Sequence, residues 1–443
     1  MGISPSASNV ADNLPSDFPK DVVFFHLTNL TNTCYCNSVL QTFLFSNDVA
    51  GYFLNLISIC NIFPNNLKNT PLFNFLLIYN KKLQYDKSLL SQDNDNVDID
   101  KKNSISRDIY IRPSAFLESI YHETSQFVRN QQNDSHEFLL YLISSFDKTI
   151  SQLKKFYLTE GSNSNTVKLQ AENKTESIDN NCPNSNVDNE KVSSHNDNAQ
   201  KENNDSSINN DDKNNDGIIK KIKSIQLFSL LFEGKRSSSF ECAYCHQIQE
   251  KIEKFTYLDI SIPLENNNKQ LDLQKLIDFS LDPDNISADE GWVCDNCKKK
   301  GVNVEITSYI KNIPPTLLIQ LQRFKYSKQT KIMEKINKYV KIQNEIHLNS
   351  GDGPKKYKLH TIICHIGGSL YQGHFVAIHR VPRDKSDIDS DTNNSSKAGD
   401  YYILASDSTV KLVDQMTVHS LIKGQTQDGS SYTPYVLLYE ISN

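Results

Sequence analysis

Residues 27–41 read LTNLTNTCYCNSVLQ and pass from a polar loop into an amphipathic helix. Cys34 therefore lies at or near the N-terminus of that helix. Backbone N–H groups and the helix dipole stabilise an anion there, so we expect the pKa of the Cys34 thiol to be lowered. A thiolate at this place is a candidate nucleophile, and the amide of Asn29, five residues earlier, is a candidate oxyanion donor. The spacing alone leaves open that Cys34 is a structural residue.

Length and composition limit the classes of protein to which the chain can belong. Its 443 residues suffice for about three domains of ordinary size, or for one large domain with insertions. The net charge of −6 excludes a generally basic nucleic-acid binder. We expect no transmembrane segment, because no apolar run approaches roughly 20 residues. We expect no secretory signal, because residues 1–20 contain no apolar h-region. Nine cysteines, some in Cys-x-x-Cys pairs, indicate metal or catalytic thiols of a reducing compartment.

Three polar segments interrupt the chain. Residues 1–21 are poor in large apolar side chains, so we expect a disordered leader, and its first residues fit the N-myristoylation pattern at Gly2. Residues 161–217 are dominated by Asn, Asp, Ser, Lys and Glu, which cannot bury enough apolar area to offset chain entropy, so we expect a disordered insert. Residues 383–399 form a second polar insert.

The remaining segments show helical and strand-like periodicity. Apolar residues three and four apart predict helices over 37–45, 115–121 and 136–150. Strand-like runs cover five further segments, at 255–264, 316–326, 358–365, 375–379 and 435–441. The pattern indicates an α+β fold with a helical N-terminal part and a mainly β C-terminal part.

Two more stretches carry candidate functional groups. Residues 132–139, QNDSHEFL, are an acidic helix start in which Asp134 and Ser135 can cap the helix. Residues 365–379, HIGGSLYQGHFVAIH, contain the histidines His365, His374 and His379. A nucleophilic cysteine needs a base, and histidine suits that task near neutral pH. The spacing does not choose among the three histidines.

Four cysteines form two Cys-x-x-Cys pairs, Cys242 with Cys245 and Cys294 with Cys297. Four thiolates in two such pairs suit tetrahedral zinc, with no position left for water, so the site would be structural. Nearly fifty residues separate the pairs, which is more than in a compact zinc ribbon. Four buried free thiols, or a redox dithiol, are the alternatives.

These segments together resemble the ubiquitin-specific proteases, a large papain-like family of deubiquitinating enzymes. Residues 27–41 are similar to the family's cysteine box, although Thr31 stands where the family usually has Gly. Residues 132–139 are similar to its Gln-Gln-Asp-x-His-Glu-Phe box, and residues 373–375 to its Gly-His-Tyr signature. The paired cysteines complete the likeness, which extends from about Val22 to Glu440.

The resemblance implies a papain-like cysteine protease fold within one catalytic domain, residues 22–443. A helical thumb would cover 22–160, zinc-bearing β fingers 218–312 and a β-rich palm 313–443. A structural Zn²⁺ would be held by Cys242, Cys245, Cys294 and Cys297.

The resemblance also assigns roles to single residues. Cys34 would attack, Asn29 would stabilise the oxyanion and His374 would be the base in hydrolysis of the isopeptide bond at the C-terminal glycine of ubiquitin. Asp134 matches the acid that contacts the Arg-bearing ubiquitin tail, and Gly373 belongs to a loop that closes over it. Ser406 falls on the usual position of the acid that orients the histidine, with Asp407 beside it. Either residue could complete the site.

The expected partners are ubiquitin and ubiquitinated proteins, in the cytoplasm, the nucleus or both. Cys36 is similar to the subgroup that WD-repeat propeller proteins activate, which implies such an activator. The alternative function, motivated by Ser406 and Thr31, is a zinc-stabilised ubiquitin-binding scaffold with weak or no catalysis. A third idea is hydrolysis of another ubiquitin-like modifier.

Overall fold

The computed structural model describes most of the chain outside the polar segments. The described residues are 10, 14–15, 18–19, 22–92, 107–160, 217–264, 271–281, 284–286, 291–328, 330–351, 353–369, 372–383, 399–425 and 430–442. The predicted acylation site at Gly2, residues 161–216 of the predicted disordered insert and residues 384–398 of the second insert lie outside them. No helix within the described ranges is both long enough and apolar enough to span a membrane.

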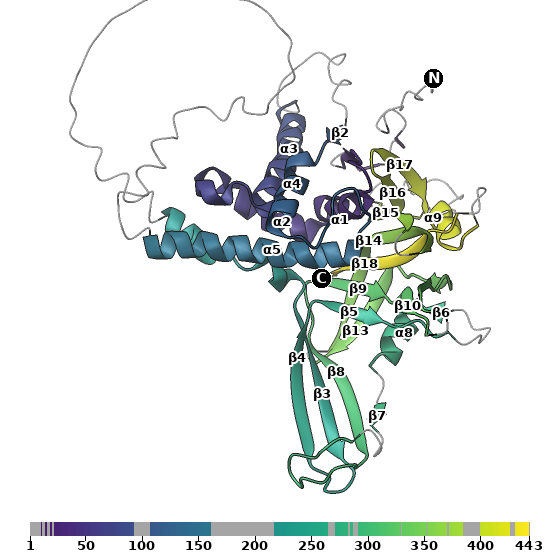
Figure 1. Cartoon of the computed structure of the whole chain (residues 1–443). Helices are drawn as coiled ribbons and strands as arrows, with labels where there is room; N and C mark the ends of the chain where they lie inside the picture. Colours follow the sequence, from purple (N-terminus) through teal and green to yellow (C-terminus); the bar gives the residue numbers. More distant parts are fainter. Residues whose placement is uncertain are drawn as a thin grey trace, which may run out of the picture.

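Helices form the N-terminal part of the molecule, where they pack around one aromatic core (Figure 1). Phe43, Phe53, Phe75 and Phe146 from four different helices meet there with ring centroids 4.6–6.3 Å apart. Burial of such large rings is a main source of stability. The helices are α1 (Cys34–Phe45), α2 (Asn47–Ile57), α3 (Pro71–Gln92), α4 (Ser114–Glu123) and α5 (Ser135–Lys155), joined by short turns at Cys60–Ile62 and Asn65–Leu67.

A sheet of twelve strands within the described residues forms the rest of the molecule. Its main path runs β17-β16-β15-β14-β13-β8-β3-β4, and β18 pairs with β14 and β9. The strands are β3 (Gly234–Cys242), β4 (Ile248–Phe255), β5 (Tyr257–Ile260), β7 (Asp284–Ile286), β8 (Val304–Asn312), β9 (Thr316–Leu321), β13 (Glu345–Ser350), β14 (Gly353–Ser369), β15 (Gln372–Val381), β16 (Tyr401–Ser406), β17 (Thr409–Asp414) and β18 (Thr433–Ile441).

Smaller elements surround this sheet. They are the parallel pair β1 (Phe24–Leu27) and β2 (Asp108–Ile111), the hairpin β10 (Phe324–Tyr326) and β11 (Met333–Lys335), the short pair β6 (Leu271–Asp272) and β12 (Val340–Lys341), and the helices α8 (Leu273–Phe279) and α9 (Gln415–Ile422).

Strands β3, β4 and β8 project away from the other elements as a long three-stranded extension (Figure 1). The segment before β3 does not belong to this extension. Its side chains Ile222, Phe228 and Phe232 are buried in the aromatic core of the helices. A second hydrophobic core lies on the sheet and includes residues of β14 and β18. Strand β5 and helix α8 pack in this second core. The predicted fingers segment, 218–312, is therefore divided by its packing into a projecting part and two parts that join the cores.

One residue within the predicted leader 1–21, Phe18, is packed against the rest of the molecule. Phe18 is buried, and its ring stacks on Phe24 and meets Tyr401 edge-on, at centroid distances of 6.0 and 5.4 Å. Burying one Phe ring yields about 2 kcal/mol, which is enough to fix a short segment. An isolated apolar residue in a polar stretch gave too little periodicity to predict this contact.

Helix α1 lies against β15, with β14 and β16 beside it. This packing brings the N-terminal end of the cysteine helix to the strand that contains His374. Residues 27–41 and 365–379, more than three hundred positions apart in sequence, thus meet at the junction of helices and sheet.

Candidate active site

Cys34 is the first residue of α1 and is only 3% exposed. Burial raises the pKa of its thiol above the ordinary value, and the carboxylate of Asp407 acts in the same direction. The backbone N–H groups of Phe375, Tyr35 and Cys34 itself face the sulfur and act in the opposite direction. The prediction of a lowered pKa was wrong for this conformation, because loss of water around the thiol outweighs the favourable backbone dipoles.

The loop before Cys34 is held by its own side chains. Asn29 Oδ1 accepts a hydrogen bond from Thr33 N at 3.1 Å, and Thr33 Oγ1 accepts one from Leu30 N at 2.9 Å. This turn places Thr31 and Asn32 in the left-handed region, with φ of 72° and 57°. Asn tolerates that region, whereas a β-branched residue loses about 1 kcal/mol or more there. Gly would adopt the conformation of Thr31 without strain, which explains physically why this position favours glycine.

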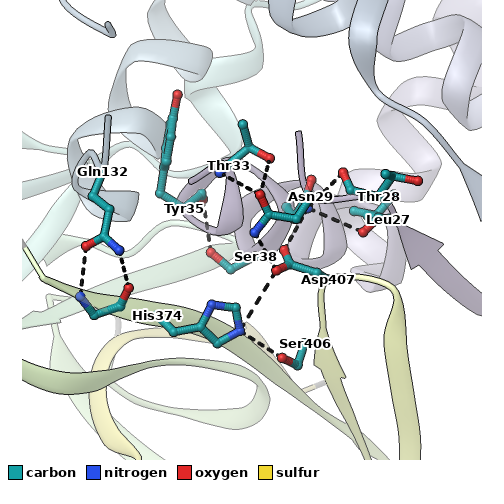
Figure 2. Close-up of polar contacts among 12 residues, drawn as sticks. Leu27, Thr28, Asn29, Thr33, Tyr35, Ser38, Gln132, His374, Ser406 and Asp407 are labelled. Atoms are coloured by element: carbon teal, nitrogen blue, oxygen red, sulfur yellow. Dashed lines mark hydrogen bonds and ion pairs between the residues drawn. The ribbon is translucent and has the colours of Figure 1, made fainter. Parts of the chain in front are cut away.

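His374 lies on β15, opposite Ile366 of β14. Its Nε2 is 2.8 Å from Ser406 Oγ and 4.0 Å from Asp407 Oδ2 (Figure 2). Its Nδ1 is on the other side of the ring. The backbone N–H of the next residue, Phe375, faces the Cys34 sulfur. Among the described residues no hydrogen bond joins the His374 imidazole to the Cys34 thiol.

Asp407 is fixed at the turn between β16 and β17, in the left-handed conformation with φ of 54°. Its Oδ1 accepts from Asn37 Nδ2 and its Oδ2 from Asn29 Nδ2, each at 2.7 Å. Its carbonyl accepts from the backbone N–H of Leu27 at 3.1 Å. The geometry therefore includes both candidates for the third position, with Ser406 in hydrogen-bond contact and Asp407 supplying a charge nearby (Figure 2).

Asn37 was not singled out as a functional residue from the sequence. It is buried on the first turn of α1, where its amide reaches the Asp407 carboxylate and the carbonyls of Leu27 and Thr28. The sequence carries one signal for this role: an Asn stands at a position where the helical spacing favours a buried apolar side chain.

Gln132 is the second residue that the sequence analysis missed. Its amide pairs with Gly373 twice: Oε1 accepts from Gly373 N at 2.8 Å, and Nε2 donates to Gly373 O at 2.5 Å (Figure 2). A Cβ at position 373 would lie 2.2 Å from His365 Nε2 and 2.5 Å from the carbonyl oxygen of Ile366. Gly373 is therefore required for the close approach of the hairpin that precedes His374.

Asp134 is the N-cap of α5, as its sequence context predicted. Its Oδ1 accepts from the backbone N–H groups of His136 and Glu137 at 2.7 and 3.0 Å, and its Oδ2 accepts from Tyr435 OH at 2.6 Å. Burial raises the pKa of this carboxyl group, and these three hydrogen bonds oppose the rise.

The other two histidines of residues 365–379 are fully buried. Burial lowers the pKa of His365 to about 3 and that of His379 well below its usual value. His379 Nδ1 contacts Thr361 Oγ1 at 2.9 Å, and its ring stacks on Phe45. Both histidines are therefore neutral packing residues, and of the three only His374 contacts Ser406.

The four paired cysteines meet at the tip of the projecting extension. Their sulfur atoms all lie within 4.8 Å of one another, with Cys242 to Cys297 at 4.0 Å and Cys245 to Cys294 at 3.6 Å. The two pairs share one backbone design, because His246 N donates to Cys242 O and Lys298 N to Cys294 O, each at 2.8 Å. Such a group of four thiols can bind a metal ion.

Comparisons with known proteins agree with this arrangement. The model of the family "Ubiquitin carboxyl-terminal hydrolase" matches residues 25–439. Ubiquitin carboxyl-terminal hydrolase 12 of Salmo salar is 24% identical over 432 residues, which cover 96% of this chain and 91% of that protein. Ubiquitin carboxyl-terminal hydrolase 4 of Arabidopsis thaliana is 24% identical over 440 residues, which cover 98% of each chain.

Solved structures show the same fold. The SAGA Ubp8/Sgf11/Sus1/Sgf73 DUB module bound to ubiquitin aldehyde matches with a TM-score of 0.57 and 15% identity, over 97% of this chain and 71% of that one. A yeast SAGA DUB module with an Sgf73 mutant matches with a TM-score of 0.56 and 14% identity, over 97% and 70%. With a family match over nearly its whole length, the chain belongs to the ubiquitin carboxyl-terminal hydrolases and is a deubiquitinating cysteine protease.

Proposed function

We propose that Cys34 is the nucleophile and His374 the base that hydrolyse the isopeptide bond at the C-terminal glycine of ubiquitin on protein conjugates. The observation that carries this assignment is the convergence of α1 and β15. It places the Phe375 N–H on the Cys34 sulfur while Ser406 and Asp407 hold the far side of the adjacent imidazole.

The chemistry follows from these positions. His374 accepts the thiol proton, and the thiolate attacks the carbonyl carbon of the terminal glycine. The oxyanion is stabilised by Asn29, whose Nδ2 carries two hydrogens, of which one is donated to Asp407. When the intermediate collapses, the C–N bond breaks, His374 returns the proton to the lysine amine and a thioester remains on Cys34. Water then hydrolyses the thioester with His374 again as base.

The raised pKa of Cys34 affects the first step. In the conformation described, the thiol is neutral near pH 7, and its proton leaves only when the imidazole comes within hydrogen-bond distance. We infer that binding of ubiquitin's tail tightens the contact between α1 and the His374 hairpin, as catalytic hydrogen bonds commonly shorten in substrate complexes.

Asp134 and Gly373 are proposed contacts of the ubiquitin tail. Asp134 keeps acceptor capacity beyond its three hydrogen bonds, because a carboxylate offers about four lone-pair sites. An Arg of the tail would find there a partly buried negative charge that already orders the start of α5.

Covalent capture by ubiquitin with a C-terminal vinyl electrophile tests the function. We expect the purified chain to gain the mass of one ubiquitin, with the adduct on Cys34 by peptide mapping. Ubiquitin-like modifiers with the same electrophile serve as matched controls and should label far more slowly. Binding of ubiquitin without any adduct would instead support a scaffold without catalysis, the reading that Ser406 and Thr31 motivated.

We further propose that the four cysteines hold a structural Zn²⁺. A tetrahedral ion with Zn–S bonds of about 2.3 Å requires sulfur atoms about 3.8 Å apart. The Cys245–Cys294 and Cys242–Cys297 sulfur atoms are 3.6 and 4.0 Å apart, which is close to that value. With four thiolates the ion would have no open position, so it would join β3 to the loop before β8 and take no part in hydrolysis. A WD-repeat propeller activator stays a prediction that rests on Cys36, which is buried on α1.

Removing the metal should loosen the extension rather than the catalytic site. We expect one zinc per chain by elemental mass spectrometry and its loss in Cys294→Ala, with a lower melting temperature, because structural zinc contributes folding energy directly. Cys60→Ala removes a half-buried thiol outside the cluster and should keep the metal. A full zinc content in Cys294→Ala would contradict the assignment.

A further inference from the structure

His26 forms a buried hydrogen-bonded pair with Asp108 near the active site, and the proposed mechanism does not use this pair. His26 lies on β1 and is 5% exposed, and its Nε2 is 2.7 Å from Oδ1 of Asp108, whose side chain is fully buried. Its Nδ1 is 2.9 Å from the carbonyl oxygen of Ser408. The ring stacks on Tyr110 at a centroid distance of 4.4 Å, which fixes its plane.

Both ring nitrogens of His26 therefore face oxygen atoms. A neutral imidazole has one N–H and one lone pair, so it can donate to only one of them. The carbonyl oxygen of Ser408 can only accept, so Nδ1 is the donor in that contact. Asp108 holds the opposite side of the ring at Nε2.

Ser408 belongs to the turn that presents Ser406 and Asp407 to His374. Strand β1 binds two successive carbonyls of this turn, since Leu27 N–H donates to Asp407 O and His26 to Ser408 O. Asn29 and Asn37 bind the carboxylate of the same Asp407. The turn is otherwise part of a hairpin at the end of the sheet path, and Asp407 is in the left-handed conformation. The turn is therefore anchored both by the segment that precedes α1 and by the first turn of α1 itself.

We propose that His26, held by Asp108, is a positioning residue that fixes the Ser406–Ser408 turn and so sets the orientation of His374. The inference rests on the catalytic roles proposed above. An apolar pair at these two positions would fill the same space without the cost of burying two polar side chains. What an apolar pair cannot do is direct a hydrogen bond at the carbonyl of the turn.

The kinetic test separates positioning from folding. In His26→Ala we expect kcat for a fluorogenic ubiquitin C-terminal amide to fall about 10- to 100-fold with KM nearly unchanged, because a displacement of about 1 Å at the reacting groups has effects of that size. Free imidazole added to His26→Ala should restore part of kcat by refilling the slot between Asp108 and Ser408. Asp108→Asn keeps the side-chain volume and should reduce kcat in the same direction, which also covers the case that His26→Ala does not fold.

Two controls make the result specific. Leu153→Ala removes a fully buried side chain about 27 Å along α5 from its start; it lowers the melting temperature and should leave kcat unchanged. The double variant His26→Ala/Asp407→Asn should lose little more than Asp407→Asn alone, because both act through one turn. A wild-type kcat in folded His26→Ala, or fully multiplicative losses in the double variant, would overturn the proposal. The proposed function is tested independently by labelling of the wild-type chain.

Discussion

Replacement of Cys34 by alanine is expected to reduce hydrolysis of a ubiquitin C-terminal amide by at least about 10⁴-fold, as removal of a catalytic nucleophile does in other proteases. No other described thiol can take its place: Cys36 is fully buried within the same helix, and Cys364 is buried in the second core. The measurement is kcat/KM with the fluorogenic substrate, from single turnovers where the rate is low.

Binding of ubiquitin should survive this change. The substitution deletes one sulfur atom from a site that is 3% exposed, and it leaves the neighbouring side chains in place. We expect the dissociation constant for ubiquitin, measured by calorimetry, to stay within about threefold of that of the wild type. Cys60→Ala is the matched control and should keep full activity. Substantial turnover in Cys34→Ala would reject the nucleophile assignment.

The second large effect is expected at Asp407 rather than at Ser406. Asp407→Asn removes the negative charge 4.0 Å from His374 Nε2. In the wild type, Asn29 and Asn37 each donate to one carboxylate oxygen of Asp407. In the variant an NH₂ group replaces one of these oxygens, so one of the two hydrogen bonds is lost. Loss of the charge and of the turn's anchor should lower kcat by about 10²- to 10⁴-fold.

Ser406→Ala removes one neutral hydrogen bond to the same nitrogen. A single bond of that kind is worth about 1 kcal/mol, so we expect a loss of roughly tenfold or less. Comparison of kcat for the two variants, with probe labelling to count competent sites, decides which residue supports the imidazole. A larger loss in Ser406→Ala would assign the orienting role to the serine and reduce Asp407 to an anchor of the loop.

Local patterns predicted the secondary structure near the site well. The helices expected over 37–45, 115–121 and 136–150 correspond to α1, α4 and α5, and the strand-like runs at 316–326, 358–365, 375–379 and 435–441 correspond to β9 with β10, β14, β15 and β18. These segments have strong 3.6- or two-residue periodicity, so local sequence was sufficient. The family resemblance implied β fingers over 218–312, but local periodicity did not locate their strands, since β4 is almost entirely exposed and shows no buried face.

The sequence did not predict the pKa values or the hydrogen-bond partners of single residues. The pKa of Cys34 was expected to fall because a helix start favours an anion, yet desolvation by the packed hairpin dominates. Gln132, Asn37 and His26 bind groups that are 241, 370 and 382 positions away in the chain. No periodicity or local motif encodes the partner of such a side chain.

By itself, the sequence determined which residue types are available: a thiol at a helix start, a histidine after a glycine-rich turn and two cysteine pairs. Those features depend on neighbours along the chain, and they identify the family. Only the tertiary structure showed that Ser406 and Asp407 lie on one side of the His374 ring, and that a buried His26–Asp108 pair contacts their turn. The physical reason is that burial and hydrogen-bond geometry arise from contacts between distant segments, which exist only once the helices have packed on the sheet.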